Sequence, residues 1–82
     1  MKKILITGGA GFIGCNLVRK ALRASFKVTN IDLLSYASNK ENNKDCENNP
    51  SYNFIKADIR DRKIIEEILF SEKPNYIMNL AA

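Results

Sequence analysis

The chain of 82 residues contains no histidine and no tryptophan, and it has only two cysteines. Histidine is the commonest metal ligand and general base, so its absence removes most metal centres and most acid–base sites. Cys15 and Cys46 match no metal-binding spacing. Without a secretory signal, they indicate free thiols in a reducing cytosol. The sequence therefore offers no metal site, and we assign it no catalytic residue.

Long apolar runs and blocks of like charge are missing as well. The first apolar run, Ile4-Leu5-Ile6, is too short for a signal peptide, and no stretch approaches the roughly 20 apolar residues of a membrane helix. The net charge of +4 is spread along the chain, which argues against a nucleic-acid-binding tail. We therefore expect a cytoplasmic protein with neither a membrane nor a nucleic acid as partner.

The apolar residues alternate between strand-like runs and helix-like stripes. Strands are expected over four apolar runs, residues 3–7, 27–32, 53–57 and 75–80. Helices are expected over residues 16–24 and 62–71, with a short polar helix over 38–46. This β-α-β-loop-β-α-β pattern predicts an α/β fold, the first half of a doubly wound (Rossmann) parallel sheet with strand order 3-2-1-4. The fourth strand would form an open edge.

Three glycines follow the first expected strand at the spacing Gly8-x-x-Gly11-x-x-Gly14. Gly8 allows a sharp turn because it tolerates positive φ. Gly11 allows the backbone to approach a pyrophosphate, and Gly14 allows the helix to pack tightly on the strand. The N–H groups at the start of that helix then face the anion. A glycine run alone also fits a plain structural turn, but the strand before it and the helix after it favour phosphate binding.

Acidic residues end the second and third expected strands. Asp32 is placed to accept hydrogen bonds from an adenosine ribose, and its carboxylate would repel a 2′-phosphate, which favours NAD over NADP. The alternative for Asp32 is a solvated residue at the end of a strand. Asp58 either accepts a bond from the adenine amino group, with Ile59 packed on the ring, or caps the turn before Asp61. Both alternatives stay open for Asp58.

Two other residues attract attention as catalysts but fit the role poorly. Tyr36 lies in the loop on the adenosine side and has no lysine nearby in a recognisable pattern. Cys15 opens a helix, where the dipole lowers a thiol pKa, but a small packed residue behind the glycine turn is the simpler interpretation.

The segment from Ile4 to Gly14 resembles the start of the extended short-chain dehydrogenase/reductases, the NAD-dependent epimerase/dehydratase family of sugar-nucleotide enzymes. Three further segments are similar to that family, residues 30–39, 56–62 and 79–82. The chain departs from the usual pattern at four positions, where Ser, Lys, Thr and Gly are common: Cys15, Leu33, Ser35 and Ser38. The departure at Leu33 leaves a UDP-sugar epimerase or another nucleotide-sugar dehydratase open.

By position, the resemblance implies a bound NAD with contacts from four segments. Those around the pyrophosphate would be Gly8, Gly11, Phe12, Ile13 and Gly14. Those along the adenosine ribose would be Asp32, Leu33, Leu34 and Ser35. Asp58 and Ile59 would hold the adenine, and Leu80, Ala81 and Ala82 would run past the cofactor.

The resemblance also implies that the catalytic parts lie outside this sequence. The family's Tyr-x-x-x-Lys pair, its Thr or Ser and its Asp-Glu pair are missing, as is a substrate domain. We therefore expect residues 1–82 to be the N-terminal part of an NAD-binding domain, inactive alone. The whole enzyme would be a homodimer acting on a nucleotide sugar. The alternatives are a free-standing nucleotide-binding module and a degenerate remnant without a ligand.

Overall fold

The computed structural model describes residues 1–34 and 40–80, and within them strands and helices alternate along the chain. The elements are β1 (Lys3–Thr7), α1 (Phe12–Arg23), β2 (Lys27–Asp32), the 3₁₀ helix η1 (Lys40–Cys46), β3 (Tyr52–Lys56), α2 (Arg62–Glu72) and β4 (Tyr76–Asn79). The strands pair in parallel in the order β3-β2-β1-β4. The predicted fold class and strand order are confirmed.

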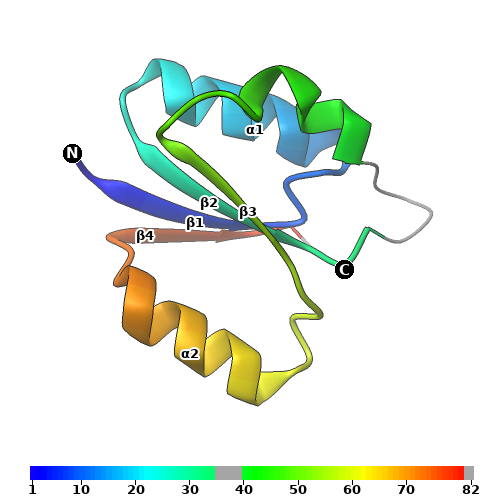
Figure 1. Ribbon diagram of the computed structural model, residues 1–82, viewed down its shortest axis with the longest axis vertical. Helices are drawn as coiled ribbons and strands as arrows, with labels where there is room; N and C mark the ends of the chain where they lie inside the picture. The colour runs from blue at the N-terminus through cyan, green and yellow to red at the C-terminus, as the bar shows by residue number, and fades with distance from the viewer. Residues whose placement is uncertain (35–39, 81–82) are drawn as a thin grey trace.

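The helices lie on both faces of this sheet, with α1 and η1 on one face and α2 on the other (Figure 1). The chain moves outward from β1 through β2 to β3 and then returns past β1 to β4. Because parallel crossovers are right-handed, this reversal places α2 on the opposite face from α1. The carboxyl ends of β1 and β4 therefore flank the switch point, where α/β sheets of this kind bind ligands.

Alternate residues of the strands feed two separate cores. On the α1 side, buried residues from the sheet, α1 and η1 pack together: Ile4, Ile6, Val18, Ala21, Val28 and Cys46. On the α2 side the buried set is Leu5, Ile31, Ala57 and Ile68. This period-two division is what a sheet covered on both faces requires. Because both cores include residues of β1, the strand that leads into the glycine turn is covered on both faces.

The helix boundaries differ from the prediction at one important place. Helix α1 begins at Phe12, four residues before the start expected from its apolar stripe, so Phe12, Ile13 and Gly14 form its first turn. Gly11 is the N-cap in an extended conformation (φ −77°, ψ 174°). The apolar stripe marks only the buried part of the helix, and the exposed first turn carries no such signal. Ser38 and Asn39 of the expected polar helix lie outside the described residues.

Strand β4 forms an open edge in the part of the chain that the structure describes. It pairs with β1 alone there, and all four of its residues are exposed. An apolar groove of about 220 Å³ lies on this side of the sheet, lined in part by Leu5, Ile65 and Ile77. The open edge expected from the sequence is present.

No helix in residues 1–34 and 40–80 is long and apolar enough to cross a membrane.

Candidate functional site

The turn after β1 is shaped by Gly8, whose φ of +77° lies in the left-handed region. Its N–H donates to the carbonyl oxygen of Ile31 at 2.9 Å, which ties the turn to β2. The N–H of Gly11 then donates to the carbonyl oxygen of Gly8 at 3.1 Å. The predicted role of Gly8 as the residue of a sharp turn is confirmed, since positive φ strains any residue with a side chain.

Gly14 packs against this turn, directly after the end of strand β1. A Cβ atom at Gly14 would lie 2.1 Å from the carbonyl oxygen of Gly8 and 2.8 Å from the Cα of Gly9. Both neighbours are backbone atoms, which cannot move aside as a flexible side chain does. The third glycine of the motif therefore lets the first turn of α1 approach the bend itself.

Asn30 organises the turn from β2, and the sequence analysis missed it. Its side chain is fully buried, and its Oδ1 accepts from the N–H of Gly9 at 2.9 Å. Its Nδ2 donates to the hydroxyl of Tyr52 at 3.1 Å. A Cβ at Gly9 would lie 2.3 Å from the Asn30 oxygen. The sequence does contain a signal for this role, because Asn30 lies among the β-branched residues of a buried strand. A buried amide there would be costly unless it found hydrogen-bond partners.

Asp32 lies against the same turn and is only 6% exposed. One carboxylate oxygen accepts from the N–H of Ala10 at 3.0 Å, and the other accepts from the N–H of Leu34 at 2.7 Å. The alternative of a solvated residue at the strand end is therefore wrong. The carboxylate joins the glycine turn to the residues that follow β2, where Leu34 has a left-handed φ of +61°.

Asp58 closes the turn after β3. Its Oδ2 lies 2.8 Å from the Arg60 Nη2, and its Oδ1 accepts from the Arg60 N–H at 2.9 Å. These hydrogen bonds hold the pKa of Asp58 at about 2, below its usual 3.8. The neighbouring Asp61 caps α2 by accepting from the N–H of Ile64 at 3.3 Å. Ile59 packs against the core on the α2 side.

The lowered pKa of Asp58 predicts a pH dependence of stability. A carboxyl group whose folded pKa is depressed stabilises the fold above its unfolded pKa and loses that contribution as the pH falls through the folded value. For Asp58 the window runs from about pH 4 to about pH 2. We expect Asp58→Asn to flatten the fall in melting temperature across this window. Superimposable pH profiles of the two proteins would contradict this role.

Exposed apolar side chains border the glycine turn. Phe12 is 82% exposed and Ile13 is 73% exposed, both in the first turn of α1. Leu33 is 46% exposed beyond Asp32. Leu80 is 40% exposed, and its N–H donates to the carbonyl oxygen of Thr7 at 2.9 Å, which places the end of β4 beside the end of β1. Ser35, Tyr36, Ala81 and Ala82 lie outside the described residues.

The structure thus brings most of the predicted segments to one edge of the sheet. The glycine turn, Asp32 and Leu80 lie at the carboxyl ends of β1, β2 and β4, respectively, with β1 between the other two strands. Asp58 follows β3, the next strand outward at the same edge. A glycine turn after a strand, the N-terminus of the helix that follows it and a carboxylate at the adjacent strand end are the parts of a dinucleotide site.

Comparison with known proteins gives the same assignment. Residues 5–82 match the family model described as GDP-mannose 4,6 dehydratase. The chain is 47% identical over 81 residues to the dTDP-glucose 4,6-dehydratase of Escherichia coli, covering 98% of this chain and 22% of that protein. It is 46% identical over 83 residues to the enzyme of the same name from Haemophilus influenzae, covering 100% of this chain and 25% of that protein.

Solved structures agree with these relatives. The dTDP-glucose 4,6-dehydratase of Bacillus anthracis, solved in complex with NAD, superposes with a TM-score of 0.95 at 37% identity, over 100% of this chain and 27% of that chain. The UDP-Glc/GlcNAc 4-epimerase of Campylobacter jejuni superposes with a TM-score of 0.91 at 30% identity, over 100% and 25%.

The chain spans about a quarter of the length of the relatives that it matches. The likeness to dTDP-glucose 4,6-dehydratases in particular, which residues 30–39 indicate, is confirmed by these relatives. The family match covers nearly the whole chain, and it includes the glycine turn, Asp32 and Asp58. The chain therefore belongs to the GDP-mannose 4,6 dehydratase family, within the NAD-dependent epimerases and dehydratases.

Proposed function

We propose that this chain binds the adenosine diphosphate half of NAD and forms the cofactor-binding part of a nucleotide-sugar dehydratase. The observation that carries the proposal is the contact between Asp32 and the glycine turn, which places a carboxylate next to a helix N-terminus. The whole enzyme would convert dTDP-glucose to dTDP-4-keto-6-deoxyglucose in the cytoplasm, as a homodimer. When bound, NAD would supply the acceptance and return of a hydride.

The first turn of α1 is built to receive an anion. Its N-cap, Gly11, provides no side-chain hydrogen bond, and the turn contains no acidic residue. In α2, by contrast, the Asp61 side chain caps the N-terminus. The leading N–H groups of a helix have no acceptor within the helix, and the helix dipole adds a partial positive charge. A pyrophosphate would supply the acceptors that this sequence leaves out.

Gly11 supports the same proposal in another way. Its φ of −77° is available to any residue, and a Cβ there would meet only the carbonyl oxygen of Gly8 at 3.4 Å, an ordinary contact distance. Neither backbone conformation nor packing within the described chain therefore requires glycine at this position. Close approach of a ligand to the backbone is the remaining reason for glycine in this motif.

We assign the ribose to Asp32. Its carboxylate accepts from the N–H groups of Ala10 and Leu34, which holds it beside the glycine turn at the end of β2, where the ribose of a bound dinucleotide is expected. A 2′-phosphate in the same place would meet a buried negative charge, which favours NAD over NADP. The other proposed contacts are those given by position: Leu33, Leu34 and Ser35 along the ribose, Asp58 and Ile59 at the adenine, and Leu80, Ala81 and Ala82 past the cofactor.

A second candidate is the cofactor-binding part of a nucleotide-sugar 4-epimerase. The superposition on the Campylobacter jejuni epimerase favours it. The dehydratase is the better proposal because the relatives of 46–47% identity carry that name. In either case, the groups that move protons on the sugar would belong to the rest of an enzyme of the relatives' length.

Melting of the 82-residue chain with and without ligand tests the proposal. A ligand that binds only the folded state stabilises it by RT ln(1 + [L]/Kd), about 2.7 kcal/mol at 100 times Kd. Because the proposed contacts lie on the adenosine diphosphate half, ADP-ribose is expected to raise the melting temperature about as much as NAD. Nicotinamide mononucleotide serves as the control and is expected to have little effect. A cooperative transition that neither NAD nor ADP-ribose moves would refute the proposal.

A further inference from the structure

Three consecutive residues of β2 hold the glycine turn in place. The N–H groups of residues 8–10 donate in turn to the Ile31 carbonyl oxygen at 2.9 Å, the Asn30 Oδ1 at 2.9 Å and the Asp32 Oδ2 at 3.0 Å. Two of these three acceptors are side-chain atoms, which stay in position only if their own side chains are held. The position of the bend therefore depends in part on what fixes the Asn30 amide.

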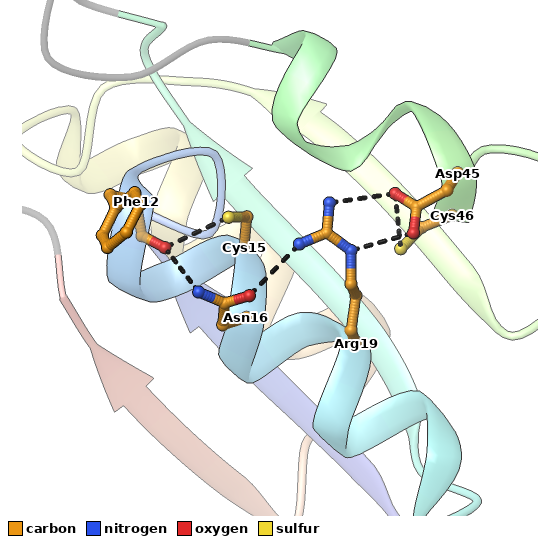
Figure 2. Close-up of polar contacts among 6 residues, drawn as sticks. All are labelled: Phe12, Cys15, Asn16, Arg19, Asp45 and Cys46. Carbon is orange, nitrogen blue, oxygen red and sulfur yellow. Dashed lines mark hydrogen bonds and ion pairs between the residues drawn. The ribbon is translucent and has the colours of Figure 1, made fainter.

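The first turn of α1, which follows the bend, is held from within the helix (Figure 2). The carbonyl oxygen of Phe12 accepts from the Cys15 thiol at 3.1 Å and from the Asn16 Nδ2 at 3.2 Å. The N–H of Cys15 donates to the carbonyl oxygen of Gly11 at 2.9 Å. Loss of a contact to β2 is therefore expected to move the bend relative to this turn, and not to unwind the helix.

The Asn30 amide is held in its turn by Tyr52 of β3. Asn30 is fully buried, and its Nδ2 donates to the Tyr52 hydroxyl at 3.1 Å. Tyr52 pairs with Val28, which shares a face of the sheet with Asn30, so the hydroxyl reaches the amide from the next strand. A buried donor that loses its acceptor is costly, and the amide would relieve that cost by turning away from Gly9.

The Tyr52 hydroxyl can be removed without changing charge or packing. Burial raises the pKa of Tyr52 above its usual value of 10.0, so the hydroxyl is neutral near pH 7. The ring packs against the core on the α1 side, and phenylalanine would keep that contact. Tyr52→Phe therefore removes the hydrogen bond to Asn30 and leaves the charge beside the proposed anion site unchanged.

We propose that Asn30 and Tyr52 are positioning residues for the dinucleotide. They act through the N–H of Gly9 and fix the bend beside the first turn of α1, where the diphosphate is proposed to bind. This inference rests on the proposed function. A site whose competent form is only partly populated binds with its affinity reduced by that fraction, so a loosened bend weakens binding without removing a ligand contact.

The test follows Tyr52→Phe by two measurements. In calorimetric titration, the Kd for ADP-ribose is expected to rise about two- to fivefold, as when the competent fraction falls to between a half and a fifth. In NMR hydrogen exchange of the free chain, the Gly9 amide is expected to exchange about five- to tenfold faster relative to the Leu5 amide in the centre of β1. A role in global stability alone would speed both amides equally.

Tyr76→Phe is the matched control, because it removes the same group from another strand. The Tyr76 hydroxyl accepts from the Lys2 Nζ at 3.3 Å, at the amino end of β4 and away from the glycine turn. Both measurements are expected to match wild type in this variant. In a chain that carries Asn30→Ala, Tyr52→Phe is expected to have no further effect on the Kd, because Tyr52 acts through Asn30. The two phenylalanine variants decide the inference even where Asn30→Ala does not fold.

The results that would overturn the inference are distinct from those that would refute the proposed function. An unchanged Kd or an unchanged relative exchange rate at Gly9 in Tyr52→Phe would overturn the inference while the wild-type chain binds ADP-ribose. Equal changes in Tyr52→Phe and Tyr76→Phe would do the same. Absence of binding by the wild-type chain would instead refute the proposed function, and the inference with it.

Discussion

Replacing Gly14 by alanine is expected to lower the free energy of unfolding by about 3 kcal/mol, at the upper end of the cost of overpacking. The added Cβ would lie 2.1 Å from the carbonyl oxygen of Gly8, so either the bend or the first turn of α1 must move. A chain of this size has a total stability of about 4–12 kcal/mol, and such a loss is a large part of it. Urea unfolding followed by circular dichroism measures the change.

Gly11→Ala is the matched control, because it adds the same methyl group to the same motif. Its Cβ meets only an oxygen at 3.4 Å, and the backbone has an ordinary φ. We expect its unfolding free energy to stay within about 1 kcal/mol of wild type, the usual range for a change at an N-cap. Its affinity for ADP-ribose is expected to fall, since the methyl group stands where the pyrophosphate approaches. Equal losses of stability in the two variants would show that the packing of Gly14 on the turn is misassigned.

Replacing Asp32 by alanine is expected to weaken NAD binding by about 10- to 100-fold. Hydrogen bonds to a charged group contribute about 1.5–3 kcal/mol, and the variant loses those to the ribose. It also leaves the N–H groups of Ala10 and Leu34 without their carboxylate acceptor, so some stability is lost as well. The Kd for NAD, measured by calorimetry well below the melting temperature, gives the effect.

NADP is the control ligand for this variant, since it carries the 2′-phosphate that Asp32 is proposed to reject. Removing the carboxylate removes that repulsion, so the Kd for NADP is expected to stay constant or fall. A collapse of the glycine turn, by contrast, would weaken the binding of both ligands equally. Equal losses of affinity for NAD and for NADP would therefore show that Asp32 has a structural role only.

The sequence was sufficient for the sheet and for the sharp bend, because both depend on local signals. Continuous apolar runs such as Ile4-Leu5-Ile6 mark strands buried on two faces, and alternation with helices restricts the strand order. Gly8 was identified from its place directly after a strand, and its φ of +77° agrees. Asp32 was identified in the same way, from its position at the end of β2.

Contacts between distant segments were not predictable from local pattern. The amide of Asn30 and the Gly9 N–H meet only after β1 and β2 pair, and Arg19 meets Asp45 only after η1 packs on α1. The start of α1 at Phe12 was missed because exposed first-turn residues leave no mark in an apolar stripe. The contact between Asn30 and Gly9 also shapes the proposed site, whose parts come from separate strands.

Calorimetric titration of the 82-residue chain with NAD and with NADP tests the central claim most directly. The account predicts one NAD per chain, bound more tightly than NADP, because the N-terminus of α1 beside the glycine turn holds the diphosphate and Asp32 holds the unphosphorylated ribose. A cooperatively folded sample that releases or absorbs no heat with NAD, or that binds NADP at least as tightly, would contradict it.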